Sequence, residues 1–314
     1  MASDVQELQT IAKLYYEEEK TQSEIGKMLG ISRPKVSRRL SEAKERGIVK
    51  IFIEEDTDEI KDLERRIYSS FPVKSVHIAS VPENDSSMAV HFTARLGAEI
   101  FPSYLKSGDR IGVNWGWTLY ELSKAFPRMN IKDCSLVQLS GAVDNANSRS
   151  YATEIIKNLS GKINSEHTYF LPCPALVDSS IIADAMKSDE KIRMLFENIS
   201  KCNKIFINIT TPDEKSCIYE AGYINDQDLK RLKQKNAVGI ICSRFYNENG
   251  EICDKELDNR TIGIPLEDIR NAECVFACIS GASKYQALYA ALKAGWIDVL
   301  VLDSILAEKL VSLL

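Results

Sequence analysis

A long hydrophobic run is missing from this sequence of 314 residues. No stretch of about 18 apolar residues occurs, and the first residues lack the apolar core of a signal peptide. We therefore expect no membrane-spanning segment and no export. The sequence predicts a soluble, cytoplasmic protein that has no membrane partner.

Patterns that bind metals or form disulfides are also missing. Histidine occurs only three times, and the eight cysteines include no C-x-x-C pair. This distribution argues against a zinc site and against a disulfide framework. It predicts cysteines that are buried as small apolar side chains in a reducing compartment. We expect no metal and no cofactor.

Positive charge is outnumbered by negative charge overall but is concentrated locally. The net charge is −5, yet the segment 33–50 is strongly basic while the rest of the chain is acidic. Because local charge decides whether a protein contacts phosphate, the acidic total does not exclude nucleic acid. The chain length predicts at least two domains.

Two short helices joined by a tight turn are predicted near the N-terminus. Thr21 can cap the first helix, and Glu24, three residues later, completes a capping box. Gly30 then ends this helix. Ser32 can cap the second helix, and Pro34 lies in its first turn, where a missing backbone N–H costs nothing.

The second helix has an apolar side and a cationic side. Val36, Leu40 and Ala43 form one apolar stripe, which leaves arginine, lysine and serine on the opposite face. Such a face suits a recognition helix in the major groove of DNA, although many charged helix faces are only solvated surface. The helix-turn-helix spacing favours DNA binding. The predicted contact residues are Thr21, Gln22, Ser32, Arg33, Lys35, Ser37, Arg38 and Arg39.

The hydrophobic pattern predicts the other elements that accompany these two helices. A preceding helix with Val5, Leu8, Ile11, Ala12, Leu14 and Tyr15 is expected to complete a small core, and Ile48, Val49 and Ile51 to Ile53 are expected to form a β segment or wing. We predict a DNA-binding domain over 1–54, an acidic linker over 55–62 and a second domain over 63–314.

The larger domain is predicted to be α/β. Short β-branched runs alternate with helical patterns, which is typical of a parallel sheet covered by helices on both faces. The predicted strands are 76–81, 110–115, 134–139, 168–171, 204–210, 237–243, 274–280 and 299–303. Ligands of such sheets bind beyond the carboxyl ends of the strands.

Four strand-end loops are candidates for binding a ligand. Two of them, Asn114 to Thr118 and Gly281 to Lys284, open helices and suit a phosphate, although a glycine in such a loop is often only a turn residue. The other two contain Ser140 with Gly141, and Ser243, Arg244 and Phe245, with Arg260 further along. An arginine there is either a phosphate ligand or a surface ion-pair partner. The predicted site residues are Asn114, Gly116, Thr118, Ser140, Gly141, Arg244, Arg260, Gly281, Ala282, Ser283 and Lys284.

These motifs together resemble the SorC family of bacterial sugar-responsive transcriptional regulators. The resemblance covers nearly the whole chain through IAKLYYEEEKTQSEIGKMLGISRPKVSRRL, IGVNWGWTLYEL, VQLSGAV, YFLPCPALVDS, AVGIICSRFYNENG, NRTIGIPLEDI and SGASKYQALYAALKAG. It implies an N-terminal winged helix-turn-helix domain and an effector domain of sugar-phosphate-isomerase type. It also implies a phosphorylated sugar as effector and a homotetramer or homodimer on palindromic operator DNA.

The chain departs from the family pattern at three places. One member of the family holds deoxyribose 5-phosphate as an imine on a lysine, and this chain has Ser140 there, whose hydroxyl cannot form an imine. Ile240 replaces a usual acidic residue, and Asn208 to Thr210 replaces a usual G-I-G. These changes alter the polar groups expected to contact sugar hydroxyls, so the effector's identity stays open.

Enzyme activity, as a sugar-phosphate isomerase or deaminase, is the alternative function. Such a reaction needs a general base against the sugar and a second acid nearby. His77, His91 and His167 lack a paired acid or nucleophile, and Asp144 is more typical of a turn. We therefore predict no catalytic residues, and a regulator of a carbohydrate or nucleoside operon that acts as a repressor.

Overall fold

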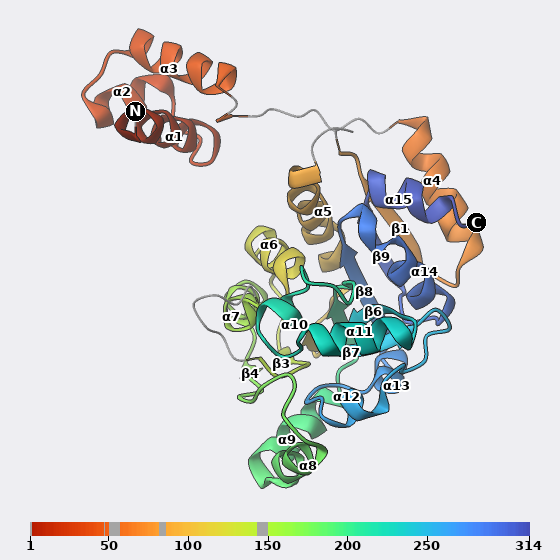
Figure 1. Ribbon diagram of the computed structural model, residues 1–314. Helices are drawn as coiled ribbons and strands as arrows, with labels where there is room; N and C mark the ends of the chain where they lie inside the picture. The colour runs from red at the N-terminus through yellow and green to blue at the C-terminus, as the bar shows by residue number, and fades with distance from the viewer. Residues whose placement is uncertain (1, 47, 50–56, 82–85, 143–149) are drawn as a thin grey trace. The chain divides into compact units, whose positions relative to one another are not determined.

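The computed structural model describes residues 2–46, 48–49, 57–81, 86–142 and 150–314 (Figure 1). The chain divides into two compact units, Met1–Glu55 and Asp56–Leu314. Among the described residues, no helix is both long and apolar enough to cross a membrane.

The N-terminal unit is built from helices α1 (Ala2–Tyr16), α2 (Gln22–Leu29) and α3 (Arg33–Glu45). Their apolar faces meet in a small core formed by Ile11, Leu14, Ile25, Val36 and Leu40, with Tyr15 and Ile31 packed against it. The predicted helix-turn-helix arrangement is confirmed. The expected wing is not seen at Ile48 and Val49, which lie in a bend, and Ile51 to Ile53 lie outside the described residues.

Local interactions define the start of α2 and the turn between α2 and α3. The Thr21 hydroxyl accepts the Glu24 N–H at 3.3 Å and the Glu24 carboxylate accepts the Thr21 N–H at 2.8 Å, so the predicted capping box is present. Gly30 ends α2 in the left-handed region, with φ of 67°. Ser32 occupies the cap position of α3, but its hydroxyl makes no capping hydrogen bond.

The acidic segment that was predicted as a linker is helical in its second half. Helix α4 (Asp58–Ser70) begins there, because the Thr57 hydroxyl accepts the Ile60 N–H at 3.3 Å and Asp58 and Glu59 favour a helix N-terminus. Ile67 of this helix is fully buried in the core of the larger unit.

The larger unit contains a parallel sheet of seven strands in its described part, in the order β1-β9-β8-β5-β2-β3-β4. This confirms the α/β prediction. The strands are β1 (Ser75–Ala79), β2 (Arg110–Val113), β3 (Ser135–Gln138), β4 (His167–Tyr169), β5 (Lys204–Ile207), β8 (Cys274–Ile279) and β9 (Val299–Asp303).

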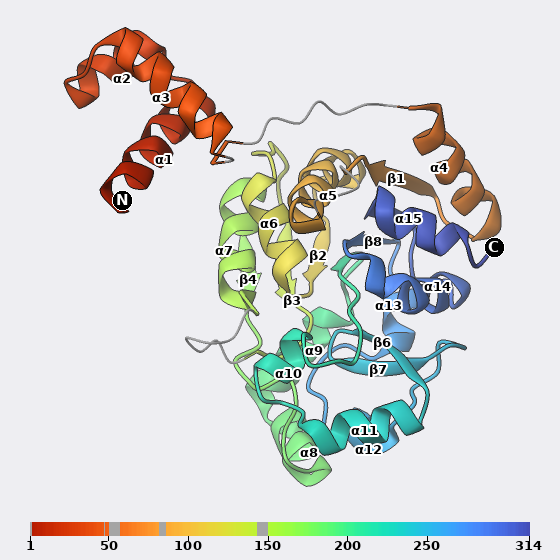
Figure 2. The same ribbon diagram turned by 45° about the horizontal axis from the view of Figure 1, so that its top comes forward.

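Helices cover both faces of this sheet, as Figure 2 shows. One face packs against α5 (Ser86–Ile100), α6 (Trp117–Ala125) and α7 (Ala152–Ile163). The other face packs against α4, α8 (Ser180–Ser188), α9 (Glu190–Ile199), α13 (Leu266–Arg270), α14 (Tyr285–Lys293) and α15 (Ser304–Val311). Successive residues of β5 alternate between the two cores, since Phe206 joins the first while Ile205 and Ile207 join the second.

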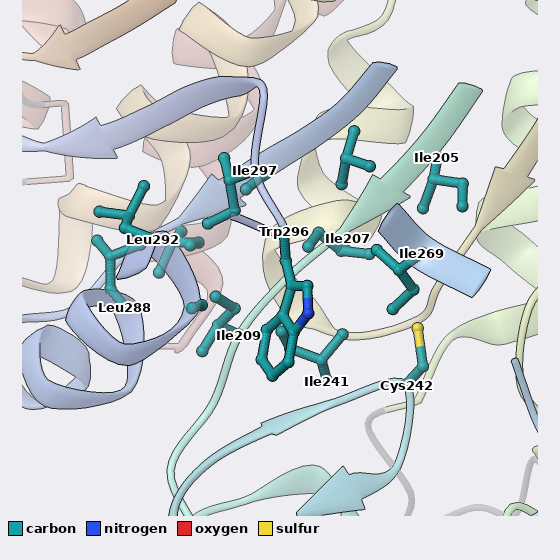
Figure 3. Close-up of a cluster of buried hydrophobic side chains, with 14 of the residues drawn as sticks. Ile205, Ile207, Ile209, Ile241, Cys242, Ile269, Leu288, Leu292, Trp296 and Ile297 are labelled. Atoms are coloured by element: carbon teal, nitrogen blue, oxygen red, sulfur yellow. The ribbon is translucent and has the colours of Figure 1, made fainter. Parts of the chain in front are cut away.

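The predicted strand over 237–243 is not part of the parallel sheet. Residues of β6 (Ala237–Ile241) pair antiparallel with β7 (Arg244–Asn247). Only two residues separate these strands, too few for the crossover that a parallel pair requires. Figure 3 shows Ile241 beside Trp296, and the Tyr246 hydroxyl donates to the Ala287 carbonyl at 2.9 Å, so the hairpin packs on α14 and the residues after it.

The other described elements are short. They are the 3-10 helices η1 (Phe101–Tyr104) and η2 (Ala282–Lys284), and the helices α10 (Cys217–Glu220), α11 (Asp226–Gln234) and α12 (Lys255–Asn259). Together with the hairpin, α10 to α12 enclose a separate small core that includes Ile218, Leu232, Phe245 and Leu257.

Candidate functional site

A cavity of about 570 Å³ lies at the carboxyl ends of the central strands. The connection after β2 runs over one face of the sheet through α6, whereas the connection after β5 leads to the other face through α13. Adjacent parallel strands with such diverging connections form the usual ligand crevice of an α/β sheet. The lining residues are Val90, Asn114, Trp115, Trp117, Thr118, Tyr151, Asn208, Thr210, Thr211, Asp213, Lys215, Cys217, Ile218, Glu220, Ile240, Cys242, Ser243, Ser283 and Lys284.

A chain of side-chain hydrogen bonds joins three neighbouring strand ends at this crevice. Asn114 Nδ2, just after β2, donates to Asn208 Oδ1, just after β5, at 2.9 Å. Ser140 Oγ, after β3, donates to Asn114 Oδ1 at 3.1 Å. The two asparagine side chains are therefore held in fixed orientations on the cavity wall.

Gly116 is required where the chain passes Asn208. Its φ of 138° disfavours any other residue, and a Cβ atom there would collide with Asn208 Nδ2. Its N–H does not face a ligand, because it donates to the Ser150 carbonyl at 3.1 Å. The next residues begin α6, whose first turn has no side-chain cap, and Thr118 lines the cavity. The uncapped N–H groups of α6 can therefore donate hydrogen bonds to an anion.

Lys284 brings positive charge to the same cavity. Burial lowers the pKa of its amine, while Cys217, Asp303, Cys278 and Asp213 act in the opposite direction. The amine makes no hydrogen bond or ion pair with any residue that the structure describes. An anionic ligand would supply the counter-charge that this group lacks.

The turn of the β6–β7 hairpin also reaches the cavity. Cys242 and Ser243 have φ of 48° and 66°, so this two-residue turn is of type I′ with side chains at both left-handed positions. Burial raises the pKa of the Cys242 thiol to about 12, which keeps it protonated and unreactive. Ser243 is 4% exposed, and its Oγ has no hydrogen-bond partner in the described part of the chain.

Four of the predicted site residues meet in this cavity, namely Asn114, Thr118, Ser283 and Lys284. Gly281 and Ala282 lead into it but do not line it, and the Gly281 N–H donates to Asp303 Oδ2 at 2.8 Å. Ser140 does not line the cavity, but its hydroxyl donates to Asn114 Oδ1 and so holds that side chain in place. Gly141 is needed for close packing, because a Cβ there would collide with the carbonyls of Cys173 and Pro174.

The two predicted arginines do not line the cavity. Arg244 is buried, and its guanidinium donates to the carbonyls of Ile264 at 2.6 Å and Gly263 at 2.8 Å and pairs with Asp258. Arg260 Nε lies 2.8 Å from Glu256 Oε1. Of the two roles considered for these arginines, the structure shows ion pairing within the protein.

The predicted site residues omit several residues that line the cavity. Asn208 and Thr210, noted in the sequence only as a departure from the family pattern, line it together with Thr211, just after β5. Tyr151 carried no comparable signal, because it lies in a long connection after the predicted strand 134–139, and Lys215 lies just beyond the departure at Asn208 to Thr210. Tyr151 stacks on Tyr120 with centroids 4.3 Å apart, and the ring of Trp117 lies 5.4 Å from that of Tyr151.

The histidines and the aspartate considered as possible catalytic groups are not found at this cavity in the described part of the chain. No histidine is among the lining residues, and no cluster of three or more potential metal ligands occurs in the ranges that the structure describes. His77 lies in β1, where burial lowers its pKa. Asp144 lies outside the described residues.

The predicted DNA-contacting face is mostly exposed. Thr21, Ser32, Arg33, Lys35, Ser37 and Arg38 are exposed, and Gln22 is half-buried. Arg39 differs from the expectation, because its guanidinium lies 3.0 Å from Asp4, 2.8 Å from Glu7 and 2.8 Å from Glu42. These ion pairs, chiefly the hydrogen bond with Glu42, raise the pKa of Arg39 and direct the side chain toward α1.

Comparison with known proteins adds to this geometry. The family described as "Putative sugar-binding domain" matches residues 55–312, and sigma-70 region 4 matches residues 6–46. The deoxyribonucleoside regulator of Bacillus subtilis (strain 168) is 31% identical over 301 residues, which cover 96% of each chain.

One solved structure is similar to this chain over both units, and another is similar over most of its length. The full-length sorbitol operon regulator SorC from Klebsiella pneumoniae is 26% identical, with a TM-score of 0.73, over 98% of this chain and 99% of its own. A DeoR family transcriptional regulator from Listeria monocytogenes is 27% identical, with a TM-score of 0.74, over 81% of this chain and 100% of its own. These three relatives are named as regulators and not as enzymes.

Proposed function

Because the chain belongs to the SorC family of sugar-responsive transcriptional regulators, we propose that a phosphorylated sugar in the 570 Å³ cavity controls its affinity for operator DNA. The chain is a DNA-binding transcriptional regulator with a sugar-binding domain, and not an enzyme. In this proposal the chain acts in the cytoplasm, and its target is the operator of a carbohydrate or nucleoside operon.

One observation carries the choice of a phosphorylated ligand. The uncapped N-terminus of α6 and the unpaired amine of Lys284 contribute to one cavity, and both favour an anion. Phosphate would contact Thr118, Ser283 and Lys284. Sugar hydroxyls would contact Asn114 and Asn208, whose amides are already oriented by each other.

The DNA-binding part of the proposal rests on α3. Its exposed cations, Arg33, Lys35 and Arg38, would contact bases and phosphates in the major groove, with Thr21, Gln22, Ser32 and Ser37 beside them. Arg39 would instead hold α3 against α1. Two or four copies of the chain would place these helices on the half-sites of a palindromic operator.

In this proposal the assembled protein has one arrangement that fits the operator and one that does not. The effector would bind these two arrangements with different affinity. Operator affinity then changes by no more than that difference. We expect release of DNA, so the chain would act as a repressor. Imine formation at position 140 is excluded chemically, since Ser140 carries a hydroxyl and no amine.

The test is a titration of the purified full chain onto the DNA upstream of its own gene. Phosphorylated pentoses, hexoses and polyols are added in turn, and each unphosphorylated parent is the matched control. We expect one phosphorylated compound to shift the DNA affinity and its parent to have no effect. Tight DNA binding that no compound changes would contradict the effector assignment, and no specific DNA binding would contradict the operator assignment.

A further inference from the structure

Ser243 combines two features that are unfavourable in the ligand-free protein. Its backbone is left-handed, with φ of 66°, a region that favours glycine, asparagine or aspartate over serine. Its hydroxyl is buried, with the whole residue 4% exposed, and Oγ finds no hydrogen-bond partner among the described residues. Buried polar groups without a partner are uncommon in folded proteins and call for an explanation.

The other residue of the same turn has a structural explanation. Cys242 is 1% exposed, and its side chain belongs to the large apolar core beside Ile241 and Trp296 (Figure 3). Packing therefore accounts for a side chain at position 242. At position 243 the buried residue is polar, and Ser243 lines the cavity.

The position of Ser243 is fixed by its surroundings. Thr210 and Ile240 exchange backbone hydrogen bonds of 3.2 Å and 2.9 Å, which tie β6 to the loop that carries Asn208. On the other strand, Arg244 is held by the carbonyls of Gly263 and Ile264. The turn cannot easily relax, so the left-handed backbone at Ser243 is imposed by the fold.

We propose that Ser243 is a specificity-determining residue, whose hydroxyl forms a hydrogen bond with an oxygen of the sugar phosphate in the cavity. The inference rests on the proposed function and adds to it a contact that was not among the predicted site residues. A ligand oxygen would satisfy the buried hydroxyl. Analogues that lack this oxygen would leave it unsatisfied and would bind less tightly.

Three variants of the full chain separate this role from a structural one. Ser243→Ala removes the hydroxyl and keeps the side chain at the left-handed position. Ser243→Gly removes the hydroxyl and also relieves the backbone. Ser280→Ala is the matched control, because Ser280 Oγ is likewise buried without a partner in the described ranges but does not line the cavity.

The experiment measures melting temperature and dissociation constant by titrating each variant with ribose 5-phosphate, 2-deoxyribose 5-phosphate and a set of ketose and polyol phosphates. For the compound that the unchanged protein binds most tightly, we expect both Ser243 variants to bind about 10-fold more weakly. Ser280→Ala should keep the original affinity. Ser243→Gly should melt at a higher temperature than Ser243→Ala.

The outcomes distinguish the inference from the function on which it rests. If the unchanged chain binds a sugar phosphate and Ser243→Ala binds it within twofold, the role of Ser243 is overturned and the proposed function stands. An equal loss of affinity in Ser280→Ala would also overturn it, by indicating a general effect of removing a buried hydroxyl. If the unchanged chain binds none of the compounds, both proposals fail.

Discussion

Asn114 and Asn208, which are 94 residues apart in the sequence, join the ends of β2 and β5 through a side-chain hydrogen bond of 2.9 Å. Each follows its strand directly, and the two strands are neighbours in the sheet. The pair therefore lies where the connections diverge to opposite faces. Their contact fixes the wall of the cavity before any ligand arrives, which reduces the ordering that binding requires.

We expect Asn208→Ala to weaken effector binding and to destabilise the protein modestly. The substitution leaves Asn114 Nδ2 without its partner, a loss of about 1 kcal/mol in the free energy of unfolding. Denaturant unfolding with and without the effector measures both effects. Asn249→Ala is the control, because Asn249 is exposed and lies far along the hairpin from the cavity lining. Full effector stabilisation in Asn208→Ala would contradict the assignment of this wall to the ligand.

Gly116→Ala should destabilise the larger unit. A methyl group at φ of 138° is strained and would collide with Asn208 Nδ2, so we expect a loss of about 1 to 3 kcal/mol. The midpoint of denaturant unfolding reports this change. Gly161→Ala is the matched control, since Gly161 lies in α7 with no atom within 4 Å of the added Cβ, and alanine there should be neutral or stabilising. Equal midpoints for the two variants would show that the tight approach at Gly116 is not required.

Arg38 and Arg39 are neighbours with different expected roles. Arg38→Ala should weaken DNA binding and lower the slope of its salt dependence by about 1, because an exposed cation is removed from a phosphate or base. Arg39→Ala should lower the melting temperature of the N-terminal unit, because it removes the ion pairs with Asp4 and Glu7. Fluorescence anisotropy at several salt concentrations and thermal unfolding distinguish them. Reversed phenotypes would place Arg39 in the DNA contact.

Effector binding should depend on pH through Lys284. Burial lowers the pKa of this amine below the ordinary value of 10.5, so the folded, ligand-free protein loses the proton at a lower pH than the unfolded chain does. Between these two pKa values the unfolded chain binds more protons, and the contribution of Lys284 to stability therefore rises with pH. Phosphate binding needs the charged form and should weaken over the same window.

Dissociation constants measured from neutral pH to pH 10 test this dependence. Lys284→Arg keeps a charge at all these pH values and should flatten the profile, whereas Lys284→Met should bind phosphate about 10- to 100-fold more weakly at neutral pH. The methionine variant should also be more stable without ligand, because a partly buried cation is removed. Unchanged affinity in Lys284→Met would exclude the amine from the phosphate site.

The sequence alone determined the features that depend on near neighbours in the chain. Thr21 and Glu24 form their capping box within one helical turn, and the stripe of Val36 and Leu40 follows from helical period. The strands before Asn114 and Gly281 are short apolar runs that any parallel sheet buries on both faces. Local hydrogen bonding and hydrophobic period are sufficient for these predictions.

Only the tertiary structure decided the features that depend on residues far apart. Arg39 lies on the predicted cationic face, but its guanidinium forms ion pairs with Asp4 and Glu7 of another helix. The run 237–241 has the pattern of a central strand, yet the two-residue turn after it imposes an antiparallel partner. Ser243 reaches the cavity because that hairpin folds over the end of β5. Packing between residues far apart in the sequence decides which polar groups find hydrogen-bond or ion-pair partners. A local sequence pattern does not contain that information.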